Sequence, residues 1–255
     1  MIRHEARLFI CAVQFLTRIP TPQLADFRPE WIQQSARYYP LVGQIVGGVS
    51  ALVLYGAAAV WSPWIAALLA VAAGVVLTGG FHEDGLADTA DGLGGGLTRE
   101  RRLEIMKDSR LGSYGALALG LTLALRVAAL AMLAEASSLL AAVALIAASG
   151  LGRAAAVGAM TVMPYGGNYG MAKEGRPDRA SIPGLAVAVL IAPWPLAFFP
   201  AIVGAGGVVT GLLVGAVPAW LAWRLIGGRT GDVLGAVEQA FEVGFLLAVV
   251  GLAAG

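Results

Sequence analysis

Long runs of apolar residues, separated by short polar segments, extend along most of the 255-residue chain. Each run approaches the roughly 20 residues that a helix needs to cross the hydrocarbon core of a bilayer. We count seven such runs, with approximate bounds 41–61, 64–80, 112–133, 138–163, 182–200, 203–224 and 233–254. The pattern predicts an all-α fold, a polytopic integral membrane bundle with about seven transmembrane helices.

Two of these runs have poorly defined ends, and one further apolar stretch is too short to span a bilayer. The runs at 64–80 and 182–200 are short or interrupted by proline. Residues 8–16 form the earlier stretch, which is expected to lie in the membrane interface or to re-enter. Short interfacial or re-entrant helices are therefore predicted beside the spans.

The overall composition agrees with a membrane protein. Hydrophobic residues make up 58% of the chain and charged residues 13%, whereas an ordinary soluble domain carries about 25% charged residues. No repeat of convincing period and no low-complexity linker divides the sequence. Residues 1–255 are therefore predicted to form a single membrane domain.

The positions of the basic residues predict a topology. They gather in the N-terminal segment, in 81–111, in 164–181 and around Arg224 and Arg229. The intervening connections carry no basic residue: 61–63, 135–138 and the stretch near Pro200. With seven spans, the positive-inside rule places every basic segment in the cytoplasm and the C-terminus outside.

Four carboxylates fall within nine residues of this apolar chain, from Glu83 to Asp91. Carboxylates are costly beside a bilayer, so the group indicates a divalent cation and a phosphate-bearing substrate. Asp84, Asp88 and Asp91 have i, i+4, i+7 spacing, which lines them along one face of a helix. Glu83 lies about 100° from that line. The three aspartates are predicted to bind a metal and to act in catalysis, and oxygen ligands favour Mg²⁺ or Mn²⁺ over zinc.

A second polar segment lies just before the third predicted span. Lys107, Asp108 and Arg110 place a carboxylate between two cations, which can join a metal and diphosphate site. Most of the charges in 98–106 are interpreted as the solvated face of a short amphipathic helix that starts at Thr98.

Acids also occur in the last predicted helix. Asp232 lies near its start, where it can cap the helix or bind a metal. Glu238 and Glu242 are one turn apart within an apolar run, so they are expected to face protein or a polar cavity rather than lipid. At least one of the two is predicted to be functional.

Other polar residues within the apolar runs are open to two interpretations. Arg153 is suited to a substrate phosphate or to a buried acid. Arg126 lies deeper in its run, so a structural partner such as a glutamate is at least as suitable. His82 is a candidate for substrate contact, although no histidine-rich metal pattern accompanies it.

Five blocks in order resemble the cobalamin synthase family: FLTRIP (15–20), YPLVG (39–43), GGFHEDGLADTADG (79–92), LEIMKDSRLG (103–112) and GRTGDVLGA (228–236). The family pattern around the acids is roughly His-x-Asp-Gly-Leu-Ala-Asp-x-x-Asp-Gly. His82, Asp84, Asp88 and Asp91 match it, and Glu83 occupies a variable position. Residues 163–175 match only loosely, so the resemblance assigns no role to Lys173 or Arg176.

The resemblance implies a phosphotransfer in cobalamin biosynthesis. A hydroxyl of α-ribazole or its 5′-phosphate attacks adenosylcobinamide-GDP and expels GMP. The metal is Mg²⁺ at Asp84, Asp88 and Asp91, and Asp91 is the preferred proton acceptor. Asp108, Asp232 and Glu238 are assigned to a second ion or to orienting the first. The expected substrate contacts are His82, Lys107, Arg110, Arg153, Arg229, Glu238 and Glu242.

The family also implies a location and partners. The expected site is the cytoplasmic (inner) membrane of a prokaryote, with the active site facing the cytoplasm, the lipid bilayer around it and no nucleic acid as partner. A homo-oligomer and an association with other cobalamin-assembly enzymes both stay open.

Three alternatives remain on sequence grounds. They are a CDP-alcohol phosphotransferase, an aspartate-rich membrane prenyltransferase and, with less support, a cation-coupled transporter built on Glu238 and Glu242. The first expects two further aspartates after an Ala-Arg pair, a pattern that the chain lacks. The absence of an inverted repeat counts against the transporter.

Overall fold

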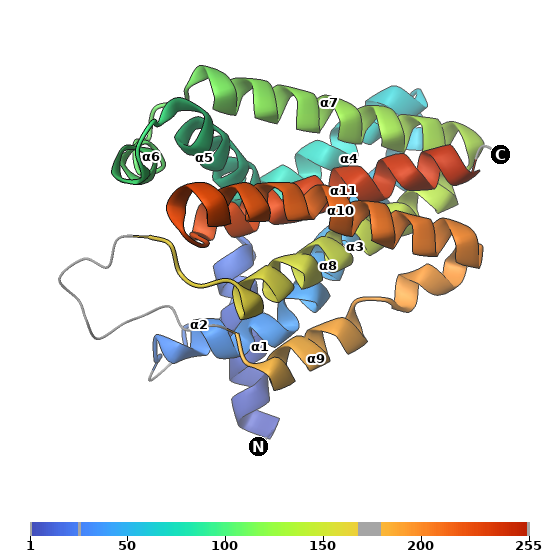
Figure 1. The fold of residues 1–255 in the computed structure, drawn as a ribbon. Coiled ribbons are helices and arrows are strands. Elements are labelled where there is room, and N and C mark those ends of the chain that lie inside the picture. Colours follow the sequence, from blue (N-terminus) through green and yellow to red (C-terminus); the bar gives the residue numbers. More distant parts are fainter. Residues whose placement is uncertain (1, 25–26, 168–179, 254–255) are drawn as a thin grey trace.

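The computed structural model describes residues 2–24, 27–167 and 180–253, and within these ranges the chain is a bundle of helices (Figure 1). The all-α prediction is confirmed. The elements are α1 (Ile2–Leu16), α2 (Glu30–Ser35), η1 (Ala36–Tyr38), α3 (Tyr39–Ala58), α4 (Pro63–Thr78), α5 (Phe81–Gly95), α6 (Arg99–Ile105), α7 (Ser113–Ala136), α8 (Ser138–Val162), α9 (Ile182–Ile191), η2 (Trp194–Phe198), α10 (Ala201–Ile226) and α11 (Gly231–Ala253).

Five helical segments are long and apolar enough to cross a membrane: Glu30–Ala58, α7, α8, α10 and α11. The pair α4 and α5 reaches that length only jointly and is bent by 89°, which raises the number to six if the pair counts as one span. The run predicted at 182–200 is a shorter apolar helix, Ile182–Phe198. The predicted count of seven is therefore not confirmed. The run at 64–80 forms α4, which has only 16 residues and ends at the sharp bend, and the prolines at 193 and 195 interrupt the run at 182–200.

Helix α11 lies at the centre of the bundle and packs against α5, α7, α8 and α10 (Figure 1). Its contact with α10 is close because α10 presents glycines to the aromatic rings of α11. A Cβ atom at Gly207 would lie 2.8 Å from the ring of Phe245, and one at Gly211 would lie 2.9 Å from the ring of Phe241. Small residues of this kind let membrane helices approach closely. The packing fixes the helix that carries Asp232, Glu238 and Glu242.

Candidate active site

A sharp elbow between α4 and α5 sets the direction of the acid-bearing helix. Gly79 and Gly80 join the two helices with φ angles of 69° and 71°, a left-handed conformation that glycine adopts without steric cost. The backbone N–H of Arg18 donates to the carbonyl of Leu77 at 2.8 Å, which ties the chain after α1 to this elbow. His82, the second residue of α5, is buried in the interior of the bundle.

The predicted acidic face lies on one regular helix, because α5 covers the whole of 81–95. Along this face Asp84 is exposed, Asp88 is half-buried and Asp91 is buried. The first turn of α11 joins them: a Cβ atom at Gly85 would lie 2.9 Å from the carbonyl oxygen of Asp232. Close approach of the two backbones thus gathers four carboxylates, which we call the acid cluster: Asp84, Asp88, Asp91 and Asp232.

The carboxylates of the acid cluster lie near enough to repel one another. The carboxylate of Asp88 is repelled by those of Asp84, Asp91 and Asp232. In the part of the chain that the structure describes, no three His, Cys, Asp or Glu side chains converge into a ready-made metal cage. Mg²⁺ seldom needs such a cage, since it keeps several waters and uses one or two carboxylates together with substrate phosphates. The all-oxygen donors of the cluster fit an ion of this open type.

Asp91 differs from the other three acids because both its oxygens accept backbone hydrogen bonds. The N–H of Gly112 donates to it at 2.7 Å and the N–H of Gly115 at 2.8 Å. These amides belong to the N-terminal end of α7, where backbone N–H groups have no partner within the helix. Asp91 thus caps α7 and joins it to α5.

We predict that Asp91→Asn lowers the free energy of unfolding by about 1–3 kcal/mol, because an amide cannot accept from both N–H groups and leaves one unsatisfied. The exposed Asp84→Asn should change it by less than about 0.5 kcal/mol. Unfolding of both variants by SDS in mixed micelles measures the difference. Equal stabilities would remove the capping role.

The predicted Lys107–Arg110 segment forms the connection between α6 and α7. Arg110 donates to both oxygens of Asp108, with Nη2 to Oδ2 at 2.6 Å. These hydrogen bonds lower the pKa of the Asp108 carboxyl to about 2. Lys107 and Arg110 are exposed. Asp108 and Arg110 therefore bind each other in the structure. The predicted contact of Asp108 with a second metal, and that of Arg110 with diphosphate, would require this ion pair to open or to accept the ligand as a third partner.

Arg229 lies in a buried connection before α11. Its N–H donates to the carbonyl of Pro164 at 2.9 Å, and its carbonyl accepts from the N–H of Gly166 at 2.8 Å. The side chain is 3% exposed. This pairing brings the segment after α8 beside the start of α11. Lys173 and Arg176, in the same predicted basic loop, lie outside the described residues.

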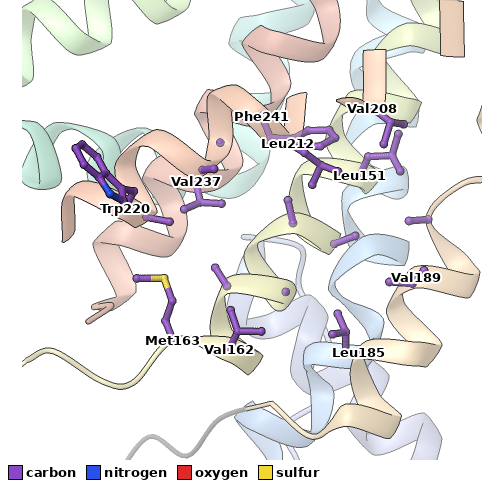
Figure 2. Close-up of a pocket in the computed structure, with 18 of the residues that line it drawn as sticks. Leu151, Val162, Met163, Leu185, Val189, Val208, Leu212, Trp220, Val237 and Phe241 are labelled. Carbon is purple, nitrogen blue, oxygen red and sulfur yellow. The ribbon is translucent and has the colours of Figure 1, made fainter. Parts of the chain in front are cut away.

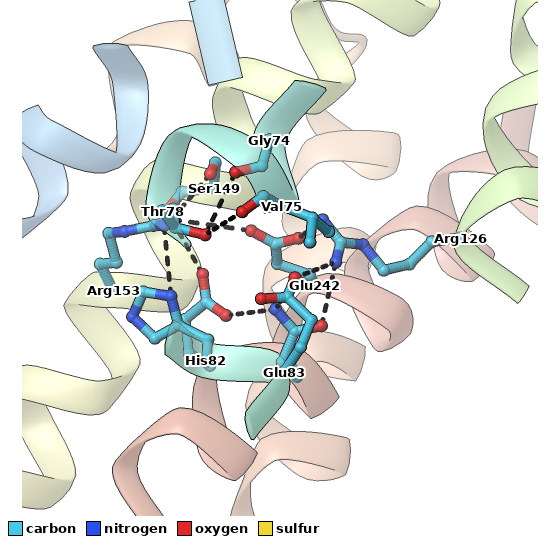
Figure 3. Close-up of polar contacts among 11 residues, drawn as sticks. Gly74, Val75, Thr78, His82, Glu83, Arg126, Ser149, Arg153 and Glu242 are labelled. Atoms are coloured by element: carbon cyan, nitrogen blue, oxygen red, sulfur yellow. Dashed lines mark hydrogen bonds and ion pairs between the residues drawn. The ribbon is translucent and has the colours of Figure 1, made fainter. Parts of the chain in front are cut away.

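A network of buried polar side chains from α5, α7, α8 and α11 occupies the interior beside the elbow (Figure 3). Its members are His82, Glu83, Arg126, Arg153, Glu238, Gln239 and Glu242. Arg126 forms ion pairs with Glu242 at 2.7 Å and with Glu83 at 3.2 Å, and it donates to Gln239 at 2.9 Å. The structural partner expected for Arg126 is confirmed.

Arg153 holds the other side of the buried network. Its guanidinium lies 2.8 Å from a carboxylate oxygen of Glu238 and donates to the hydroxyl of Ser149 at 2.7 Å. His82 Nδ1 lies 3.5 Å from the same guanidinium. Of the two interpretations of Arg153, the structure therefore shows the buried acid. The predicted contacts of Arg153 and His82 with substrate stay predictions.

Glu238 and Glu242 face a polar cavity of about 20 Å³ rather than lipid, as their position in an apolar run predicted. Both are almost fully buried, with exposed fractions of 0% and 3%. With every acid ionised, the buried network contains three carboxylates against two guanidinium groups. A role for either glutamate in substrate binding stays a prediction.

Sequence reasoning missed two parts of this arrangement. Gln239 bridges Glu83 at 3.2 Å and Glu238 at 3.0 Å, and a polar residue within an apolar run was the available signal. The other is the cap that Asp91 provides for Gly112 and Gly115, which are distant in sequence and carry no side chain to indicate a partner. The position of Glu83 around the helix axis, away from the line of the three aspartates, did indicate that it lies off the acidic face.

Comparison with known proteins identifies the family. The family model described as cobalamin-5-phosphate synthase matches residues 8–250 of this chain. An adenosylcobinamide-GDP ribazoletransferase of Leptothrix cholodnii is 48% identical over 249 residues, which cover 94% of this chain and 93% of that protein. Proteins of the same name from Azorhizobium caulinodans and Vibrio cholerae are 47% and 40% identical, covering 93% and 95% of this chain and 93% of each relative. No solved structure matches. The chain belongs to the cobalamin-5-phosphate synthase family of membrane transferases that act in cobalamin biosynthesis.

Proposed function

We propose that the chain is an Mg²⁺-dependent adenosylcobinamide-GDP ribazoletransferase. The observation that carries this proposal is the acid cluster, in which Asp84, Asp88 and Asp91 of α5 meet Asp232 at the start of α11. The names of the relatives supply the substrates, and the carboxylates suit a metal-bound diphosphate.

The proposed reaction breaks one phosphoanhydride bond and forms one phosphoester bond. A hydroxyl oxygen of α-ribazole, or of its 5′-phosphate, forms a bond to the cobinamide-side phosphorus of adenosylcobinamide-GDP. The bond from that phosphorus to the bridging oxygen breaks, and this oxygen leaves on GMP. The hydroxyl proton passes to a carboxylate. The products are GMP and adenosylcobalamin or its 5′-phosphate.

The residues divide into three roles in this proposal. Asp84, Asp88 and Asp232 hold Mg²⁺, which when bound neutralises charge that builds up on the diphosphate. Asp88, beside the other two, is the proposed proton acceptor in place of Asp91. Asp91 positions α5 against α7, since both its oxygens are engaged by backbone amides.

The basic groups around the acid cluster complete the proposed site. Lys107, Arg110 and Arg229 are the proposed diphosphate contacts, because guanidinium and ammonium groups bind phosphate through charge-assisted hydrogen bonds. The proposed orientation follows the positive-inside rule, with this end of the bundle in the cytoplasm and the chain in the inner membrane.

Removal of the metal tests the cofactor. Protein purified in detergent should release GMP from adenosylcobinamide-GDP when α-ribazole and Mg²⁺ are present. GMP release should stop when excess EDTA is added, and it should resume when Mg²⁺ is restored. The expected cause is loss of charge neutralisation at the leaving group. Turnover that persists in EDTA would refute the metal-dependent mechanism.

The same assay separates the alternatives. A CDP-alcohol phosphotransferase or a prenyltransferase would give no cobalamin product from these substrates, and neither would a transporter. Chromatography of the corrinoid products, measured alongside GMP release, distinguishes transfer to α-ribazole from simple hydrolysis of the diphosphate.

A further inference from the structure

A large apolar groove opens in the bundle, and none of the described residues that line it belongs to α5. It has a volume of about 670 Å³ and lies between α8, α9 and α10, with α11 at its floor (Figure 2). Its lining is almost wholly apolar, from Leu151 and Val208 at one end to Met163 and Trp220 at the other. The volume is within the range of sites that hold small molecules.

The groove exists because the walls carry small residues and α9 is short. Gly158 and Ala155 of α8 and Gly215 and Ala219 of α10 line the groove, and their small side chains leave space between the two helices. Helix α9 ends at Ile191, and the short η2 continues past Pro193 without filling the space. A Cβ atom at Gly158 would meet no other atom within 4 Å. The groove is thus open space rather than a tight helix contact.

The groove is long enough to hold an acyl chain that spans one leaflet of a bilayer. On α10 it extends from Val208 to Trp223, which corresponds to about 22 Å at 1.5 Å per residue. Half of a hydrocarbon core is roughly 15 Å thick. Since α8, α10 and α11 are each long and apolar enough to span, hydrocarbon rather than water adjoins the groove.

One end of the groove carries groups suited to a lipid headgroup. Trp220 and Trp223 line it there and are each 56% exposed. The guanidinium of Arg224 lies over the ring of Trp220, 5.4 Å from its centroid. Tryptophan and arginine at the end of a spanning helix are typical of the membrane–water interface, where the cation meets lipid phosphate.

We propose that the groove holds one acyl chain of a membrane phospholipid, with the lipid phosphate at Arg224. The acyl chain fills the space between α8, α9 and α10 from the Trp220 end, and the headgroup stays in the interface. This site is separate from the acid cluster and takes a different class of ligand. It stabilises the contact of α9 with α8 and α10, which the protein alone leaves open.

Filling the groove tests the proposal. Gly158→Phe places a ring in the groove, whereas Gly120→Phe places the same ring on α7, where a Cβ atom also meets nothing within 4 Å and the position is exposed outside the groove. Each protein is delipidated by extended detergent washing, and retained phospholipid is measured by mass spectrometry. The wild type and Gly120→Phe should keep phospholipid that Gly158→Phe has lost. Ala216→Leu, at another lining residue, provides a second filled variant if Gly158→Phe does not purify.

The headgroup contact is tested by Arg224→Gln. Mixed micelles containing anionic and zwitterionic phospholipids are offered in excess and then washed away. The wild type should retain anionic lipid in preference, and the variant should lose that preference while still retaining lipid in the groove.

Three outcomes would overturn the proposal. The first is a wild-type protein that retains no lipid. The second is equal retention by the filled and control variants. The third is unchanged lipid retention in Gly158→Phe together with another defect. A changed oligomeric state would assign the groove to a second copy of the chain, and changed corrinoid binding would assign it to the substrate. Activity is not needed for any of these readouts, so they stand apart from the proposed transferase reaction.

Discussion

Asp88→Asn is expected to lower kcat for GMP release by on the order of 10²–10³-fold or more, the loss typical of removing a group that stabilises transition-state charge. The amide keeps the shape of the side chain but removes the negative charge that three neighbouring carboxylates surround. It cannot bind Mg²⁺ as a carboxylate does, and it cannot accept the hydroxyl proton. Asp84→Asn, on the exposed part of the same face, should show a loss of similar size.

The measurement is steady-state GMP release by purified variants over a range of Mg²⁺ concentrations. Glu135→Gln is the matched control, because it is the same change at an exposed acid near the C-terminal end of α7, away from the acid cluster. Its activity should equal that of the wild type. Near-normal turnover by either aspartate variant, with the protein folded, would remove that aspartate from the metal site.

Arg126→Met is expected to cause the largest loss of stability, about 3–5 kcal/mol. The substitution keeps most of the side-chain volume but leaves Glu83, Glu242 and Gln239 without their common cation. Buried carboxylates without a partner are costly in protein and more so at membrane depth. Because Arg126 ties α5 to α11 through these partners, the loss should also loosen the contact that brings Asp232 to Asp84.

The free energy of unfolding in SDS mixed micelles measures this effect, and a double-mutant cycle assigns it. Arg126→Met with Glu242→Gln should be more stable than Arg126→Met alone, since the second change removes a buried carboxylate whose remaining cation, Arg153, lies 3.8 Å away. Arg101→Met provides a control, because the Arg101–Glu104 pair is exposed on α6 and should contribute less than about 1 kcal/mol. A double variant less stable than the Arg126 single variant would contradict the pairing.

Local periodicity predicted the acidic face correctly, because helical geometry alone fixes the relation between residues four and seven apart. It also separated Glu83, which the structure pairs with Arg126 rather than placing on the acidic face. The environment of Glu238 and Glu242 followed from the cost of charge in lipid. These inferences needed no knowledge of which helices are neighbours.

Tertiary contacts could not be obtained in the same way. The approach of Gly85 to Asp232 joins residues far apart in sequence, and it depends on the absence of a side chain. The Asp91 cap depends on backbone N–H groups of α7, which no residue type reveals. The predicted count of seven spans was not confirmed, and hydropathy along the chain does not register the 89° bend that follows Thr78.

The buried network also has a consequence for biogenesis. Helices enter the membrane in chain order, and α7 can pair Arg126 with Glu83 of the preceding α5 as soon as it arrives. Arg153, on α8, has its carboxylate partner on α11, the last helix of the described chain. Until α11 has been inserted, the α8 arginine has only Ser149 and His82 within reach. A nascent chain shortened before Glu238 would therefore carry the charge of Arg153 in the bilayer without a carboxylate partner. Insertion of α11 is thus the step that completes the assembly of the protein.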